Sequence, residues 1–123
     1  MRLTVFSARC LLVLQALLLL MGTLMPGVWR DNTVAKLGVP GVISPLAHYV
    51  LFFGMAGVAS IAPLRWSLSR VILLGLGLAL LSESLQFLAI DRHPRWLDVG
   101  IDMAGVLTAM VMVWYARSPH RLA

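Results

Sequence analysis

The sequence predicts an all-α integral membrane protein, a four-helix bundle with short antiparallel connections. Three observations predict it: the chain of 123 residues is 60% hydrophobic and only 12% charged, its mean hydropathy is +0.91, and its apolar residues gather in four long runs. A soluble domain is about half apolar and about a quarter charged, and so small a chain could not bury this much apolar surface in water. The composition therefore excludes a soluble globular domain. It also excludes a disordered chain, which would be poor in apolar residues.

The four runs are each 17 to 20 residues long and cover residues 11–28, 46–62, 71–90 and 97–115. A helix needs about 20 apolar residues to cross about 30 Å of hydrocarbon, and in lipid each span must be helical because its backbone groups find no water. The runs therefore predict four spans in a single membrane domain of residues 1–123. The first run also resembles a signal peptide, but no small-residue cleavage site follows it, and we expect it to remain as a span.

Each run is bounded by residues that favour the membrane surface or break a helix. In chain order these are Arg9, Trp29, Pro63, Arg70, Asp91, Arg95 and Arg117. Between the runs, residues 29–45 are expected to form the longest loop, because glycine and proline recur there. Residues 63–70 form a short basic loop, and residues 91–96 form a tight polar turn. Connections this short indicate antiparallel neighbours.

The basic residues predict an orientation, because they favour the cytoplasmic side of a membrane. With both termini inside, six basic residues are cytoplasmic and four are outside: Arg2, Arg9, Arg65, Arg70, Arg117 and Arg121 against Arg30, Lys36, Arg92 and Arg95. Trp29 and Trp96 would then mark one interface of the membrane, and Trp66 and Trp114 the other. We therefore expect a multi-pass protein of the inner (cytoplasmic) membrane with both termini in the cytoplasm.

Five polar residues inside or beside the spans are the candidates for function, because ionisable groups in a membrane are costly. They are His48, Glu83, Gln86, Asp98 and Asp102. Since the chain crosses in alternating directions, all five fall at the same end of the bundle, beside the predicted 29–45 and 91–96 connections. Arg92 and Arg95 are expected to reach back to the acids. This predicts a polar pocket near the outer leaflet, although such residues can also simply hold helices together.

At these residues the sequence resembles the VanZ-like family of small bacterial membrane proteins, over about residues 44–112. The matching blocks are His48 with the six residues up to Gly54, the segment Glu83-Ser84-Leu85-Gln86, Arg92 six residues before Asp98, and Gly105. Two positions depart from the family pattern. Asp102 stands where asparagine is usual, and Pro45 stands where lysine is usual. If that lysine balances the acids in relatives, Lys36 or Arg95 would do so here.

The resemblance implies a role at the cell envelope, since the family is named for a protein that gives low-level resistance to the glycopeptide teicoplanin; it implies no particular reaction. The first hypothesis is a polar site that binds or acts on an amphiphilic or lipid-linked envelope molecule. In that hypothesis the candidate catalytic residues are His48, Glu83 and Asp98, and the binding residues are Gln86, Arg92, Arg95 and Asp102. The alternatives are a non-catalytic drug-binding or structural membrane protein and a small proton-coupled exporter.

No cofactor and no metal ion are expected. His48, Glu83 and the two aspartates could ligate a metal, but the di-iron bundle pattern needs Glu-x-x-His on two helices, and this chain has Glu-x-x-Gln once. The expected partners are membrane lipid, a lipid-linked or glycopeptide ligand, and a second copy of the chain. Nucleic acid is excluded, because the basic residues form no continuous stripe.

Overall fold

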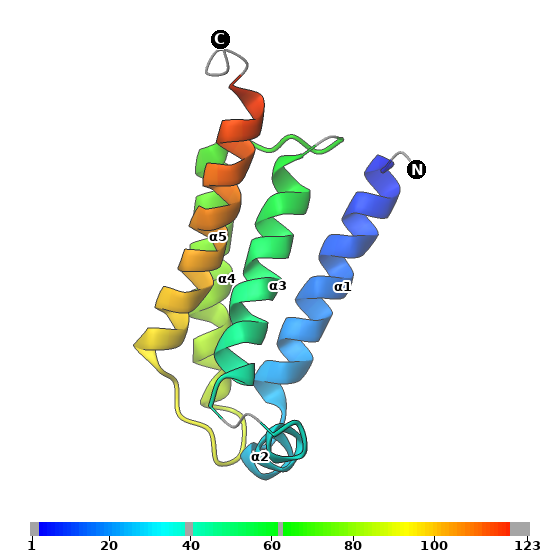
Figure 1. The fold of residues 1–123 in the computed structure, drawn as a ribbon. Helices are drawn as coiled ribbons and strands as arrows, with labels where there is room; N and C mark the ends of the chain where they lie inside the picture. Colours follow the sequence, from blue (N-terminus) through cyan, green and yellow to red (C-terminus); the bar gives the residue numbers. More distant parts are fainter. Residues whose placement is uncertain (1–2, 39–40, 62, 119–123) are drawn as a thin grey trace.

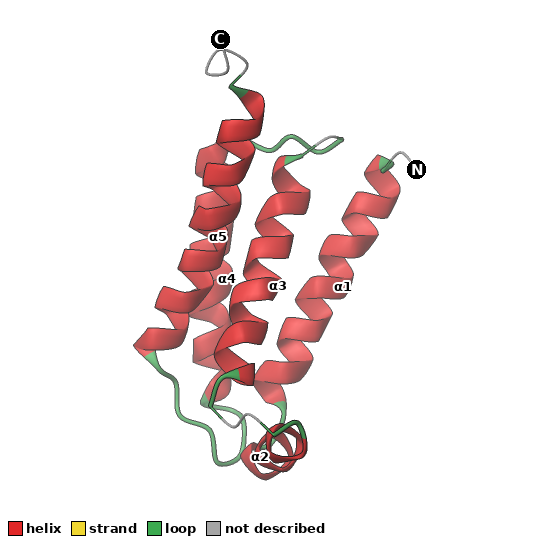
Figure 2. Ribbon diagram, viewed as in Figure 1, coloured by secondary structure: helices red, strands yellow, loops and turns green. Residues whose placement is uncertain are grey.

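The computed structural model consists of five helices and describes residues 3–38, 41–61 and 63–118 (Figure 1). The helices are α1 (Val5–Leu24), α2 (Gly27–Lys36), α3 (Ile43–Ser60), α4 (Leu68–Gln86) and α5 (Trp96–Arg117). Within the described ranges there is no strand (Figure 2). The predicted all-α fold class is therefore confirmed. Three residues used in the sequence analysis, Arg2, Ala62 and Arg121, lie outside the described ranges.

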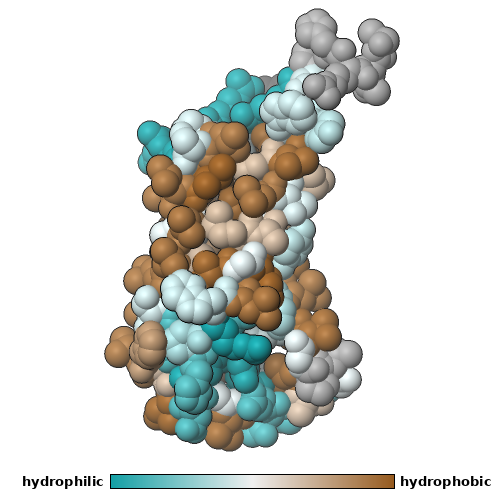
Figure 3. All heavy atoms as spheres, turned by 90° about the vertical axis from the view of Figure 1, so that its left-hand side faces the viewer, coloured by the Kyte–Doolittle hydropathy of each residue, from teal (hydrophilic) through white to brown (hydrophobic). Residues whose placement is uncertain are grey.

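Four of the five helices, α1, α3, α4 and α5, are long and apolar enough to cross a membrane. They run alongside one another, and α1 and α5 carry the two ends of the chain at the same end of the bundle (Figure 1). The face drawn in Figure 3 has an apolar band with hydrophilic patches above and below it. The chain is a multi-pass membrane protein, because such a band needs lipid rather than water around it.

Side-chain caps mark where α1 and α4 begin, whereas α3 and α5 begin without one. Helix α1 begins at Val5, six residues before the predicted start, because the side chain of Thr4 accepts a hydrogen bond from the backbone nitrogen of Ser7 and Ser7 bonds back to Thr4. This reciprocal capping box satisfies amide groups that a helix start leaves unpaired. The side chain of Ser67 likewise accepts from the backbone nitrogen of Arg70 at the start of α4.

The predicted ends of the first and third spans are wrong. The first was expected to reach residue 28, but α1 stops at Leu24 because Pro26 follows and the residues before a proline avoid helical geometry. The third was expected to reach residue 90, but α4 stops at Gln86 and the chain turns over the next residues. Phe87 and Leu88 are apolar, yet both are more than three-quarters exposed. Hydropathy therefore predicts a span that is longer than the helix, because apolar residues continue beyond the last turn of α4.

Helix α2 corrects the prediction that residues 29–45 form a loop. It lies across the end of the bundle that holds the start of α3 (Figure 1). Its ten residues mix apolar Val28 and Trp29, both mostly exposed, with charged and polar residues, so no hydropathy signal marks it. The glycine that ends it is informative, since Gly38 has a φ of +77°, a left-handed conformation that favours glycine.

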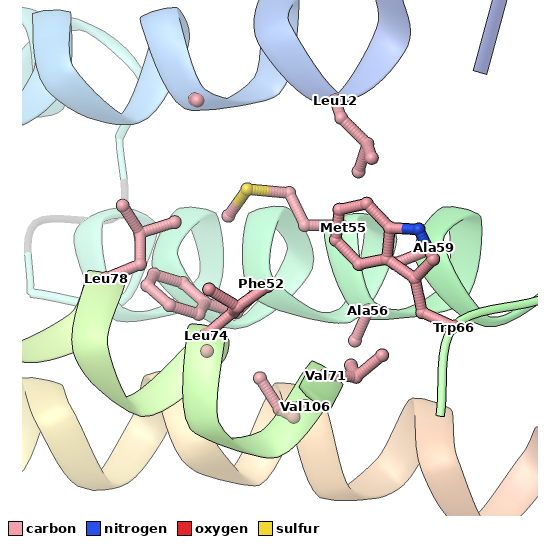
Figure 4. A pocket seen from close by; sticks show the side chains of 12 residues that line it. Leu12, Phe52, Met55, Ala56, Ala59, Trp66, Val71, Leu74, Leu78 and Val106 are labelled. Carbon is pink, nitrogen blue, oxygen red and sulfur yellow. The ribbon is translucent and has the colours of Figure 1, made fainter. Parts of the chain in front are cut away.

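The core lies between α3, α4 and α5, and α3 packs most closely on α5. Helix α1 packs on α3 and α4 and leaves an apolar cavity of about 190 Å³ beside them. Leu12 faces this cavity from α1, Phe52 and Met55 from α3, and Trp66 from the α3–α4 connection (Figure 4). Trp66 was expected in an interfacial aromatic belt, but it is partly buried against the core.

Candidate functional site

Three polar side chains from three helices meet near the α2 end of the bundle: His48 from α3, Glu83 from α4 and Asp102 from α5. We call them the buried cluster. Nδ1 of His48 lies 2.9 Å from Oδ1 of Asp102, and one nitrogen or oxygen of each residue lies within 4.8 Å of the others. All three are buried, and Asp102 is 0% exposed. The polar residues predicted to gather at one end of the bundle thus include three that share one site.

Gly105 explains why His48 and Asp102 can meet. A Cβ atom at this position would lie 2.5 Å from the carbonyl oxygen of Tyr49 and 3.0 Å from the backbone nitrogen of Phe53. Only a glycine lets α5 approach the α3 backbone so closely. Gly105 lies three residues after Asp102, and Tyr49 follows His48 directly, so this close approach holds the two side chains opposite one another.

Glu83 is held in place by two hydrogen bonds. The side-chain amide of Gln86 donates to Oε1 at 3.1 Å, and the backbone nitrogen of Arg95 donates to Oε2 at 2.8 Å. The spacing of three residues puts Gln86 on the same helix face as Glu83. The second bond ties the chain before α5 to the end of α4. Both carboxylate oxygens therefore have fixed positions at the edge of the buried cluster.

The expected ion pairs between the turn arginines and the acids do not form. Within the described ranges, Arg92 and Arg95 make no ion pair with Glu83, Asp98 or Asp102. Arg95 reaches Glu83 through its backbone instead. In the buried cluster, His48 forms an ion pair with Asp102, and Glu83 forms none. Oδ2 of Asp102 is buried without a hydrogen-bond partner.

Asp98 lies apart from the buried cluster. It was expected to share one polar pocket with Asp102, but it is only half-buried and lines a separate cavity at the end of the bundle. A separation of four residues moves a side chain about 6 Å along a helix. Asp98 is therefore one turn nearer the membrane surface, where it faces the turn arginines rather than His48.

The cavity that Asp98 lines has a volume of about 330 Å³, and we call it the arginine cavity. It lies between α2, the start of α3, the segment after α4 and the start of α5. Its charged lining residues are Arg30, Asp31, Asp91, Arg92, Arg95 and Asp98, and Gln86 lines it from α4. Gln86 thus contacts both this cavity and the buried cluster.

Arg92 is the unusual member of the arginine cavity. Its Nη1 atom is buried and has no hydrogen-bond partner, whereas Arg30 forms an ion pair with Asp31 at 2.7 Å. Burial, with a smaller effect from the neighbouring charge of Arg30, lowers the pKa of Arg92. The positive charge of Arg92 is therefore destabilised where it lies.

Arg30 is a cavity residue that the sequence does not single out, because the glycines and prolines of residues 29–45 predict a loop. Its place depends on Gly27, whose backbone nitrogen donates to the carbonyl oxygen of Ile90 at 3.1 Å. A Cβ atom on Gly27 would lie 2.6 Å from the carbonyl oxygen of Asp91. This contact brings the first turn of α2 against the 90–91 turn, and so brings Arg30 beside Arg92. A glycine directly after Pro26 was the one available signal.

A second cavity of about 190 Å³ opens on the flank of the bundle between α4 and the start of α5. Apolar side chains line most of it, namely Leu80, Phe87, Pro94, Trp96 and Val99. Glu83 reaches it from the buried cluster, and Arg95 lines both this flank cavity and the arginine cavity. A polar cavity at the membrane surface and an apolar one on the lipid-facing side thus share a wall.

Comparison of the chain with protein-family models, with curated proteins and with solved structures gives no match. The resemblance to the VanZ-like family therefore stays a prediction. Of the two residues expected to replace the family lysine, neither Lys36 nor Arg95 forms an ion pair with an acid in the part of the chain that the structure describes. Pro45, which stands at the lysine position, lines the arginine cavity.

Proposed function

We propose that this protein binds the anionic headgroup of an amphiphilic or lipid-linked envelope molecule in the arginine cavity. The observation that carries the proposal is the buried Nη1 of Arg92, which has no hydrogen-bond partner. Leaving a buried charged donor unpaired is costly. A guanidinium pairs best with a phosphate or carboxylate, to which it can donate two parallel hydrogen bonds. An anionic group in this cavity would satisfy Arg92 and offset the repulsion from Arg30.

The two cavities support an amphiphile over a free anion. The arginine cavity, at about 330 Å³, is within the size range of small-molecule sites, about 300–1,000 Å³. The flank cavity is apolar and faces the side of the bundle, where the hydrocarbon part of a membrane molecule would lie. Because Arg95 lines both cavities, a headgroup at Arg92 and a chain beside Phe87 and Trp96 can belong to one molecule.

A catalytic role for His48, Glu83 and Asp98 stays a prediction. Asp98 lines the arginine cavity itself, and Glu83 is linked to it through Gln86 and the backbone of Arg95. The site lies near one end of the bundle, which favours binding over export, because transport sites lie near the bilayer midplane.

The proposal includes a location. In the sequence, six basic residues fall in the segments expected on the side of the termini and four in those expected on the side of α2. This bias supports placing α2 and the arginine cavity on the outer face of a bacterial inner membrane. There the site would meet lipid-linked envelope precursors or an acylated glycopeptide. In cells, we expect this binding to contribute to resistance to drugs of the teicoplanin type. This part of the proposal rests on the VanZ-like resemblance.

Binding can be measured directly with a matched pair of short-chain lipids. Phosphatidic acid carries a phosphomonoester headgroup, and diacylglycerol with the same chains carries none. With the purified full chain in detergent, we expect saturable thermophoretic binding of fluorescent phosphatidic acid, incomplete competition by inorganic phosphate, and no saturable binding of diacylglycerol. Equal binding of both lipids would contradict the proposal, and full competition by phosphate at low concentration would point to a free anion instead.

In cells, we expect the native chain to lower susceptibility to teicoplanin and the Arg92→Met variant to lose that effect. The physical reason is that the variant lacks the guanidinium that pairs with the anionic group. Susceptibility is compared in one host at matched membrane abundance. The control is Lys36→Gln, which removes a positive charge from an exposed residue of α2 outside the arginine cavity. Equal susceptibility of cells with and without the native chain would contradict the role in resistance but not the binding of an anionic headgroup.

A further inference from the structure

We propose that the buried cluster of His48, Glu83 and Asp102 binds one divalent transition-metal ion. One imidazole and two carboxylates form a nitrogen and oxygen ligand set that suits Zn²⁺ and neighbouring first-row ions. The proposal does not rest on the anion binding proposed above, because the metal site lies in the helix bundle and the headgroup lies in the arginine cavity.

The geometry is the first argument. One possible ligand atom from each side chain lies within 4.8 Å of the other two. Around Zn²⁺ with ligands at about 2.1 Å, neighbouring ligand atoms of a tetrahedral site lie about 3.4 Å apart. Nδ1 of His48 and Oδ1 of Asp102 lie 2.9 Å apart in a hydrogen bond, which a metal ion bound to both residues would replace. The three side chains are therefore close enough for small side-chain rotations to bring them around one ion.

The charge of the cluster is the second and independent argument. Asp102 is 0% exposed, and its Oδ2 atom is buried with no hydrogen-bond partner. Glu83 is the second buried carboxylate, and in the described ranges no lysine or arginine forms an ion pair with either. A buried carboxylate needs a paired charge, all the more in a membrane. A divalent ion supplies that charge and takes the unpaired oxygen as a ligand.

The surroundings of Glu83 are those of a metal-bound carboxylate. Such ligands are oriented by hydrogen bonds from neighbouring groups, and here Gln86 and the backbone of Arg95 hold both oxygens of Glu83. Three protein ligands leave a coordination position open. Glu83 also lines the flank cavity, so a water molecule or another small oxygen ligand has a route to that position.

The sequence contains these candidate ligands but no short metal-binding motif, because each ligand comes from a different helix. Familiar metal motifs place two ligands within one short segment. Here the ligands are separated by 35 and 19 positions along the chain, and only the packing of α3, α4 and α5 brings them together. The absence of Glu-x-x-His from the sequence argues against a di-iron centre and says nothing about a mononuclear one.

Direct metal analysis of the purified full chain tests the proposal. After chelator treatment and dialysis against Zn²⁺, we expect one tightly bound ion per chain, measured by mass spectrometry of the metal and by competition with a chromophoric chelator. Glu83→Gln and Asp102→Asn are each expected to weaken Zn²⁺ binding at least about tenfold, the loss typical when a metal's surroundings are disturbed. Asp91→Asn and His93→Gln are the matched controls, because they make similar changes in the turn beside the site; we expect both to bind as the native chain does.

Co²⁺ in place of Zn²⁺ gives a readout that needs no variant. We expect visible d–d absorption bands from the native chain that Zn²⁺ abolishes by displacement. Absence of these bands together with no Zn²⁺ retention would overturn the proposal, as would equal Zn²⁺ affinity in the native chain and in the folded double variant Glu83→Gln/Asp102→Asn. Helical circular dichroism and gel filtration establish that each variant is folded. Phosphatidic acid binding is measured with and without Zn²⁺. This separates a protein that binds no metal at the buried cluster from one that binds no headgroup in the arginine cavity.

Discussion

Replacing Arg92 by methionine is expected to weaken the binding of phosphatidic acid by about 10- to 100-fold. A hydrogen bond to a charged group contributes about 1.5–3 kcal/mol, and every 1.4 kcal/mol, roughly, is a factor of ten in the dissociation constant. Methionine keeps much of the length of the arginine side chain and removes its charge and donors. The dissociation constant is measured by thermophoresis with the same lipid pair used for the native chain.

The free energy of unfolding of the same variant should be unchanged or higher. In the unliganded protein Nη1 of Arg92 is buried without a partner, and removing an unpaired donor is neutral or stabilising. Weaker binding combined with undiminished stability distinguishes a ligand-binding arginine from a structural one. Lys36→Gln controls for the loss of one positive charge, and we expect it to bind as the native chain does. Lower stability of Arg92→Met, with unchanged lipid binding, would assign Arg92 to the fold instead.

Replacing Gly105 by alanine is expected to lower the free energy of unfolding by about 1–3 kcal/mol, the usual effect of forcing a group into packed space. The new Cβ atom would clash with the backbone of α3 at Tyr49. A helix backbone cannot relieve such a clash by changing rotamer, as a side chain can. We also expect weaker Zn²⁺ binding, because α5 must move away from α3 and Asp102 moves with it. Stability is measured by chemical unfolding in micelles, followed by circular dichroism.

Gly100→Ala is the matched control in the same helix. Nothing lies within 4 Å of a Cβ atom at Gly100, so the substitution should raise helix stability by up to about 1 kcal/mol. The two alanine substitutions are therefore expected to have opposite signs. If Gly105→Ala were as stable as Gly100→Ala, the close contact between α3 and α5 would not be what positions the buried cluster.

The spans could be predicted from the sequence because long apolar runs leave the chain few alternatives to membrane helices. Their ends could not, because these depend on local hydrogen bonds and turns, such as the Thr4 capping box and the turn that follows Gln86. Helix α2 was missed for a related reason. Its length and mixed composition resemble a surface loop, and its contact with the 90–91 turn comes only with the folded bundle.

The sequence predicts which polar residues lie at the same end of the bundle, but it does not predict which of them are in contact. Alternating directions of the spans place His48, Glu83 and Asp102 at one end of the bundle without any knowledge of packing. The rotation of each helix, which pairs His48 with Asp102 rather than Asp98, depends on close contacts such as that at Gly105. The sequence also could not predict the hydrogen bond between Arg95 and Glu83, because Arg95 donates it from the backbone nitrogen and not from the charged side chain.

The hydrogen bond from the backbone of Arg95 to Glu83 separates two properties of position 95. One is the charge of its side chain, and the other is its part in holding Glu83 in place. The bond from position 95 to Glu83 needs only a peptide N–H, which every amino acid except proline provides. Substitutions of Arg95 can therefore alter the charge that faces both cavities while Glu83 stays anchored. Over evolutionary time this would let ligand preference drift at position 95 without loss of the architecture beneath it, and proline is the one replacement we expect selection to reject there.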